Sequence, residues 1–164
     1  MKYYIDQSFD LPWSNYDILK EDGGIAFKVE TEATLGHELE VYNCDGQCVG
    51  RIVEQLAAVP TYLVWENGVQ CGKIIRKLAF PKPKLVVDYK DWIIERKVGF
   101  SHIEVKDKKK NPVAVINREK WRMTDHFVLD VEHEEDVITV VLLMLVVSAF
   151  REEANAATLL SALI

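Results

Sequence analysis

The sequence predicts a mainly β fold, a twelve-stranded antiparallel barrel that encloses a central hydrophobic C-terminal helix. Turn dipeptides that contain glycine recur about every 22 residues between alternating polar and apolar runs, a pattern typical of successive β-hairpins. After about 130 residues of such runs comes an uncharged apolar stretch, residues 137–150. A helix that is apolar on every side has to be buried on every side, and a wide barrel leaves an interior space for it.

The first three hairpins repeat the same pattern. Their turns, Asp22-Gly23, Asp45-Gly46 and Asn67-Gly68, are dipeptides that adopt a positive φ at little cost in tight turns. Six residues after each glycine stands a β-branched residue that follows a basic one. Residues 38–42 alternate between polar and apolar side chains before the second turn. This alternation is expected for a strand with one buried face and one wet face.

Two more hairpins and a final strand follow. Residues 84–89 and 92–97 are predicted to form one hairpin, and residues 103–107 and 113–116 form another across a lysine-rich turn. Residues 126–131 form the last strand, so that eleven breaks along the sequence separate twelve strands. A propeller would use twelve strands in only about three blades and would leave no place for the helix, so the barrel is preferred.

The chain is predicted to be one domain with a short extension. Its 164 residues and 18.8 kDa fit a single core. We expect the barrel in residues 1–153, with its core helix at residues 134–153, and an apolar extension at residues 154–164. The apolar stretch has 14 residues, fewer than the roughly 20 that a membrane span needs, and carboxylates stand on both sides of it. The side chains expected in the core are Val137, Ile138, Val141, Leu142, Leu145 and Val146.

Composition and charge narrow the classes of function. The net charge of −6 provides no global positive field, so nucleic acid is not expected as a partner. The cysteines Cys44, Cys48 and Cys71 are odd in number, and the first ten residues contain no apolar signal region. These features predict free thiols and a cytoplasmic location. A C-x3-C pair with one further cysteine and no nearby histidine does not match structural zinc, and no cofactor is expected.

The order of these segments resembles the LURP-one-related family of the tubby C-terminal-like superfamily. Residues 41–46, 80–84, 90–92 and 130–132 carry the resemblance, which extends over nearly the whole chain. The resemblance implies a twelve-stranded barrel around a central C-terminal helix. Related barrels include phosphoinositide-binding tubby domains and the phospholipid scramblases, so peripheral membrane binding through lipid headgroups is an alternative function that it implies. No shared catalytic residue carries over, and the acidic net charge departs from the tubby pattern.

Two groups of basic residues are candidate contacts for an anionic headgroup or another partner. Local positive charge attracts anionic lipid. Lysines on exposed hairpins also discourage edge pairing without any ligand, which is the competing interpretation. The candidates are Lys73, Arg76, Lys77, Lys82, Lys84, Lys106, Lys108, Lys109 and Lys110.

Histidines carry the enzymatic alternative. His102, His126 and His133 stand at or near strand ends in the last third of the chain. Asp125 and Asp130 stand close to His126, as do the carboxylates that orient a histidine metal ligand or general base. No H-E-x-x-H or comparable spacing supports a metal site, so surface or capping roles are preferred. A metal-dependent enzyme that uses these three histidines is the second alternative.

The function that the sequence favours is a non-enzymatic binding or scaffold module, in the cytoplasm or peripheral to a membrane. The helix is expected to fill the barrel, and no motif brings polar groups together. A short apolar segment that is not needed to fill the barrel has to cover something else. Three roles are open to it: folding over a barrel mouth, packing against a second copy, or touching a membrane surface. Packing is favoured, so we expect a protein partner or self-association through Leu159, Leu160, Leu163 and Ile164, with anionic lipid as the other partner considered.

Overall fold

The computed structural model describes the backbone of residues 1–8, 15–34, 36–77, 84–97, 101–121 and 124–162. Side chains are described for residues 1–6, 15–32, 37–77, 84–97, 101–119 and 126–149. The strands that these residues form are β1 (Lys2–Ser8), β2 (Tyr16–Lys20), β3 (Ile25–Thr34), β4 (Gly36–Tyr42), β5 (Cys48–Gln55), β6 (Thr61–Glu66), β7 (Val69–Lys77), β8 (Lys84–Val87), β9 (Trp92–Lys97), β10 (His102–Asp107), β11 (Pro112–Trp121) and β12 (Thr124–Val131).

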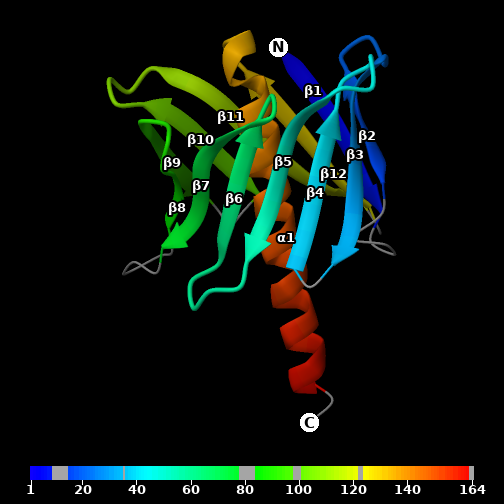
Figure 1. Cartoon of the computed structure of the whole chain (residues 1–164), viewed down its shortest axis with the longest axis vertical. Coiled ribbons are helices and arrows are strands. Elements are labelled where there is room, and N and C mark those ends of the chain that lie inside the picture. The colour runs from blue at the N-terminus through cyan, green and yellow to red at the C-terminus, as the bar shows by residue number, and fades with distance from the viewer. Residues whose placement is uncertain (9–14, 35, 78–83, 98–100, 122–123, 163–164) are drawn as a thin grey trace.

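The described strands make one antiparallel sheet of twelve strands that curls into a nearly closed barrel (Figure 1). Sequence neighbours pair from β1 to β8 and again from β9 to β12, while β1 pairs with β12. The pairing of β1 with β12 runs from Lys2 opposite Asp130 to Ser8 opposite Thr124. The fold class expected from the sequence, an antiparallel barrel around a C-terminal helix, is confirmed.

The barrel is open along one seam, between β8 and β9. In the described part of the chain these two strands are not paired by backbone hydrogen bonds. Instead, β8 pairs with β7 and β9 pairs with β10. The predicted hairpin of residues 84–89 and 92–97 is therefore wrong. The physical reason lies at Asp88, which turns back to β7: its N–H donates to the Lys73 carbonyl at 3.0 Å, and its carboxylate accepts the Lys73 N–H at 2.7 Å.

The C-terminal helix differs in its bounds from the expected helix of residues 134–153. Glu134–Asp136 form a single 3-10 turn, η1, and the α-helix α1 then extends over Val137–Ala162. Residues 150–162 contain neither glycine nor proline, so no helix-breaking residue separates the expected extension from the core helix. Figure 1 shows α1 running along the barrel and projecting beyond its lower end.

The first half of α1 fills the barrel interior. Its side chains from Val137 to Ala149 are buried, except Ile138, which is half-buried. The approach is closest at β5, where a Cβ on Gly50 would lie 3.1 Å from carbons of both Ile138 and Leu142. The absence of a side chain at this position lets the sheet approach the helix. The largest fully buried side chains of the wall are Ile5, Ile18, Ile52, Tyr62, Ile74, Ile103, Ile116, Phe127 and Leu129.

Polar contacts fix the start of α1 against the wall. The hydroxyl of Thr139, which is fully buried, donates to Glu66 Oε1 on β6 at 2.6 Å, and the Tyr89 hydroxyl donates to the same oxygen at 2.8 Å. Burial and then the Glu66 carboxylate raise the pKa of Tyr89. Lys90 Nζ donates to the buried Asp136 carboxylate at 3.0 Å. These contacts join β6, the segment after β8 and the first turns of the helix.

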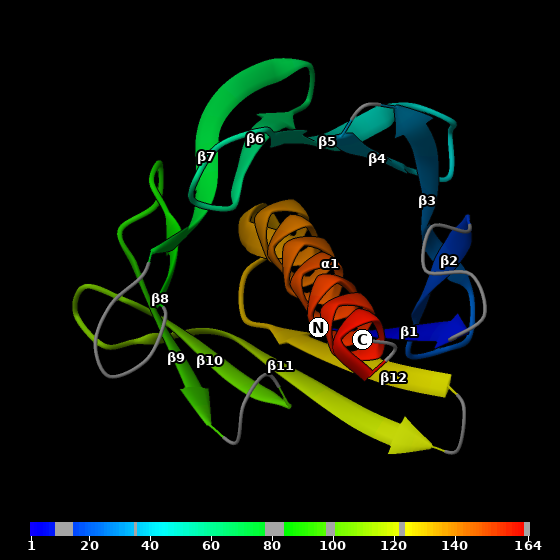
Figure 2. The same cartoon turned by 90° about the horizontal axis from the view of Figure 1, so that it is seen from below.

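The two ends of the barrel differ. At the helix-start rim, where α1 enters, the strands are joined by tight turns, and Gly23, Gly46 and Gly68 adopt the positive φ expected for them. At the helix-exit rim, where α1 leaves, odd-numbered strands end and even-numbered strands begin. Figure 2 looks onto this rim from below, with the C-terminal end of α1 toward the viewer. The connection between β5 and β6, residues 56–60, lies at this rim.

Candidate functional site

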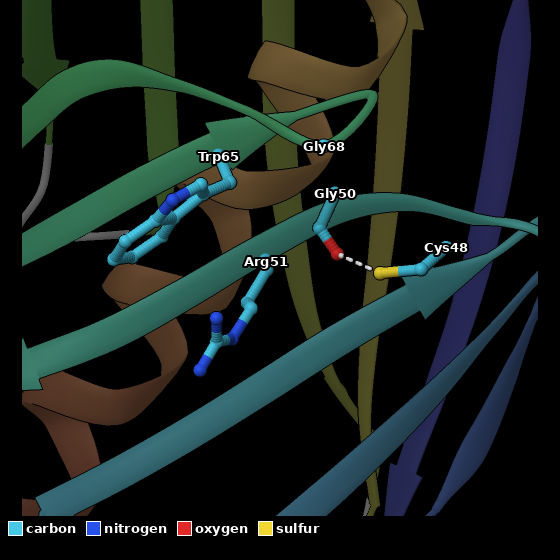
Figure 3. A pocket seen from close by; sticks show the side chains of 5 residues that line it. All are labelled: Cys48, Gly50, Arg51, Trp65 and Gly68. Atoms are coloured by element: carbon cyan, nitrogen blue, oxygen red, sulfur yellow. Dashed lines mark hydrogen bonds between the residues drawn. The ribbon is translucent and has the colours of Figure 1, made fainter.

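Polar side chains that could contact a ligand lie mainly on the outer wall and at the rims, because α1 occupies the interior. One pocket of about 220 Å³ lies over β5 and β6 (Figure 3). It is lined by Cys48, Gly50, Arg51, Trp65 and Gly68.

The basic group in this pocket is already partnered. The Arg51 guanidinium lies 5.0 Å from the Trp65 ring centroid, within the range of a cation–π contact. It also donates to Glu38 at 2.5 Å through Nε and approaches Glu40 at 3.8 Å. Two carboxylates and one ring therefore hold Arg51 against the outer wall, where its positive charge is compensated.

Cys48, at the edge of this pocket, is not activated as a nucleophile. Its Sγ donates to the Gly50 carbonyl at 3.4 Å (Figure 3). Burial, and then the neighbouring Glu40 carboxylate, raise the pKa of the Cys48 thiol. Since the thiolate is the reactive form, a raised pKa keeps this side chain unreactive at neutral pH.

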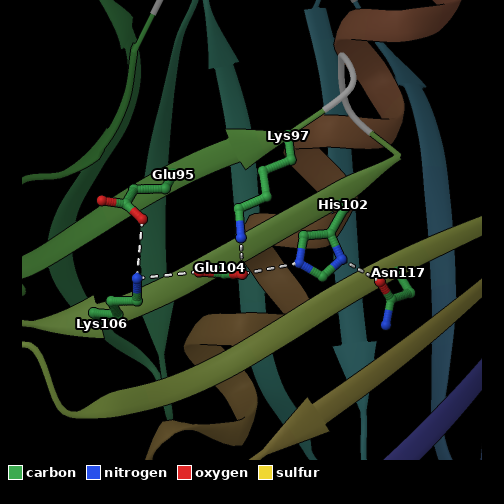
Figure 4. Close-up of polar contacts among 6 residues, drawn as sticks. All are labelled: Glu95, Lys97, His102, Glu104, Lys106 and Asn117. Atoms are coloured by element: carbon green, nitrogen blue, oxygen red, sulfur yellow. Dashed lines mark hydrogen bonds and ion pairs between the residues drawn. The ribbon is translucent and has the colours of Figure 1, made fainter.

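A second polar cluster covers the outer face of β9, β10 and β11 (Figure 4). Glu104 accepts hydrogen bonds from Lys97 at 2.6 Å and Lys106 at 3.1 Å, and His102 Nε2 lies 3.2 Å from it. These contacts, led by that with Lys97, lower the pKa of Glu104 to about 2. Lys106 also contacts Glu95 at 3.0 Å, and the two carboxylates raise the pKa of Lys106. The charges of this cluster are compensated within it.

The structure separates the first group of basic candidates. Lys73, Lys77 and Lys84 lie on β7 and β8, where Lys77 stands directly opposite Lys84 and both are exposed. Arg76 lies two residues after the buried Ile74 and therefore shares the inward face of β7. Burial, and then the Arg76 charge, lower the pKa of Arg96, consistent with the two arginines facing one another. Lys82 lies outside the described residues.

The second group of basic candidates is largely in ion pairs. Lys106 belongs to the Glu104 cluster, and Lys108 contacts Asp91 at 2.7 Å. Lys109 and Lys110 are exposed in the turn between β10 and β11, where Lys110 adopts a φ of 66°. This group therefore presents less uncompensated positive charge than its sequence suggests.

The candidate histidines do not come together. His102 Nδ1 lies 2.6 Å from Asn117 Oδ1 on β11, His126 contacts Asp6 on β1, and His133 is exposed just before η1. Among the residues that the structure describes, no group of three or more His, Cys, Asp or Glu side chains is placed to hold a metal ion.

One pair on the inner wall near the helix-exit rim was not predicted. His37 Nδ1 lies 2.5 Å from Glu54 Oε2, and the backbone N–H of His37 donates to the same oxygen at 3.1 Å. A signal for it was present, because His37 stands two residues before the buried Leu39 and Glu54 two residues after the buried Ile52. Their pairing depends on the register of β4 and β5, which the sequence did not specify.

The loop at residues 56–60 is the most exposed apolar feature of the described residues. It lines a shallow pocket of about 510 Å³ together with Glu54 and Gln55. Leu56 is 81% exposed, and Ala57 and Ala58 are also exposed. This loop stands at the same rim from which α1 projects, so an exposed apolar loop and the C-terminal end of the helix lie at one end of the barrel.

Comparison with known proteins establishes the family. A family model described as LURP-one-related matches residues 1–148. The chain belongs to the LURP-one-related family. The uncharacterized protein YxjI of Bacillus subtilis (strain 168) is 26% identical over 126 residues, which cover 75% of this chain and 76% of that protein.

A solved structure supports the LURP-one-related architecture. The X-ray structure of an Arabidopsis thaliana protein matches with a TM-score of 0.59 and 17% identity, over 91% of this chain and 92% of that one. At this identity the likeness shows the fold alone, a tubby-like barrel. The LURP-one-related match ends at residue 148, so the projecting part of α1 lies beyond the matched region.

Proposed function

We propose that this LURP-one-related chain is a non-enzymatic binding module whose partner contacts the helix-exit rim. The observation that carries the proposal is the division of α1 into two parts. Residues 137–149 fill the barrel, whereas the helix continues to Ala162 beyond the barrel end (Figure 1). Since the interior is occupied by the chain itself, the surface left for a partner is external.

The polar clusters support a binding role over a catalytic one. The groups around Arg51 and Glu104 are compensated by their own neighbours. The Cys48 thiol has a raised pKa. A catalytic site commonly brings a nucleophile or general base together with perturbed groups in a cleft, and the clusters on the outer wall lack that combination.

A second candidate function is binding of an anionic headgroup on the outer face of β7 and β8. It is favoured by Lys77 and Lys84, which are exposed and directly opposite in register. Within the described residues neither lysine makes an ion pair, in contrast to Lys106 and Lys108. Two uncompensated lysines side by side attract an anion.

Site-specific photo-crosslinking in living cells tests the main proposal. A photoreactive residue at position 56 samples the helix-exit rim, and the same residue at the exposed position 45 samples the helix-start rim as the matched control. We expect a discrete protein or lipid adduct from position 56 and none from position 45. Equal labelling from the two positions, or an adduct from position 45 alone, contradicts the proposal.

A further inference from the structure

The geometry points to a lipid bilayer as the partner of the helix-exit rim, with the loop of residues 56–58 and the projecting end of α1 entering the interface between headgroups and acyl chains. This inference rests on the proposed function and names the class of partner. It differs from headgroup binding on β7 and β8, because its contact is apolar and at one end of the barrel.

The connections at the two rims differ in composition. At the helix-start rim the connecting sequences are polar, as in residues 21–24 (EDGG) and 43–47 (NCDGQ). At the helix-exit rim the described connection, residues 56–60, reads LAAVP and has no charge. The distal sequence of the chain, residues 154–164 (ANAATLLSALI), also has no charge. The loop and the backbone of residues 154–162, which follow Arg151, Glu152 and Glu153 in α1, belong to the same end of the barrel.

The length of α1 explains why its end leaves the barrel. At about 1.5 Å per residue, a helix of 26 residues is about 39 Å long. Residues 137–149, whose described side chains fill the barrel interior, account for about half of that length. Strands of up to ten residues that tilt in a barrel wall span less height than the whole helix. The C-terminal turns therefore extend past the wall, at the rim that carries the loop of residues 56–60.

A bilayer fits this rim better than a second copy of the chain. Lys77 and Lys84, both exposed, stand at the ends of β7 and β8 that belong to the helix-exit rim. Two copies docked rim to rim bring these like charges toward one another, whereas anionic headgroups complement them. Apolar segments flanked by lysines are typical of surface-bound proteins that insert shallowly. Within the described residues no helix is long and apolar enough to cross a membrane.

Vesicle co-sedimentation of the chain of residues 1–164 tests the inference. The probes are phosphatidylcholine vesicles and vesicles of phosphatidylcholine with phosphatidylglycerol at about three to one. We expect binding to both, stronger to the anionic vesicles. Leu56→Asp lowers the bound fraction about tenfold, because one inserted leucine is replaced by a charge. Val69→Asp is the matched control, since Val69 is 65% exposed at the opposite rim, and it changes binding by less than about twofold.

A second variant and a folding control show whether a loss of vesicle binding comes from the lost contact or from misfolding of the variant. Leu160→Asp, in the projecting sequence, also lowers vesicle binding. Each variant keeps the circular dichroism spectrum and the unfolding midpoint of the parent chain.

Four outcomes overturn the bilayer inference. Binding to anionic vesicles alone that Lys77→Glu abolishes and Leu56→Asp leaves intact assigns the contact to β7 and β8. A dimer that Leu56→Asp dissociates, without vesicle binding, assigns the rim to a second copy. A protein adduct at position 56 without vesicle binding overturns the bilayer but leaves the proposed function in place, whereas the absence of both overturns both.

Discussion

The close approach of β5 to α1 makes a specific prediction about coupling between Gly50 and Leu142. A methyl group at position 50 would lie 3.1 Å and 3.4 Å from the two terminal carbons of Leu142 and 3.1 Å from Ile138. Gly50→Ala therefore overpacks the helix contact, and such changes destabilise by about 1–3 kcal/mol. Leu142 is fully buried, and Leu142→Ala is expected to cost about 2–5 kcal/mol by leaving a cavity.

The double variant is expected to be more stable than the sum of the two changes predicts. Removing the terminal carbons of Leu142 eliminates two of the three close contacts at position 50, and the new methyl group fills part of the cavity. Coupling between residues in contact is typically about 0.5–3 kcal/mol, and we expect about 1–2 kcal/mol here. Leu142→Ala with Gly50→Ala should then be little less stable than Leu142→Ala alone.

Urea unfolding followed by tryptophan fluorescence provides the four free energies of the cycle. The matched control combines Gly50→Ala with Met144→Ala, because Met144 is equally buried but lies about 200° around the helix from Leu142. The control pair should be additive within about 0.5 kcal/mol. Additivity within the same limit for Gly50 and Leu142 would refute the packing argument.

Three further perturbations test the polar contacts. Thr139→Val removes a buried donor to Glu66 and is expected to cost about 1–3 kcal/mol in urea unfolding, while an unchanged midpoint would show that this hydrogen bond is not stabilising. Lys90→Met removes the partner of a buried carboxylate in η1 and is expected to cost a similar amount, about 1–3 kcal/mol, in urea unfolding at neutral pH; an unchanged midpoint contradicts a stabilising ion pair. Because the pKa of Glu104 is lowered to about 2, its stabilising contribution is present above the usual carboxyl range and is lost as the pH falls toward about 2. Carboxyl NMR titration should show this low value, and a higher one in Lys97→Met; the same pKa in both proteins would contradict the cause assigned to it.

The sequence predicted the architecture because its strongest signals are local. The turn dipeptides at Gly23, Gly46 and Gly68 reported hairpins through backbone conformation, and the helix was apolar on all sides. The unpaired β8–β9 seam was not predictable from such signals. It depends on Asp88 bonding to β7 rather than continuing the strand, a contact between residues 15 positions apart.

The candidate site was less predictable, because side-chain partners depend on register. The sequence grouped Lys106 and Lys108 as positive charge, whereas Glu95, Glu104 and Asp91 compensate it across neighbouring strands. The end of the helix posed a different problem. The sequence divided the chain after the charges of Arg151, Glu152 and Glu153, but it did not show that one helix continues across this division to Ala162.

The element that fills this barrel is synthesised after all of the strands that surround it. β1 cannot pair with β12 until residues 124–131 have been made, and α1 follows them. At about 5–20 residues per second, the strands spend several seconds with their apolar faces unfilled. We expect the nascent chain to depend on chaperones that shield such faces. Completion of α1 is then the event that converts a curled sheet into a folded barrel.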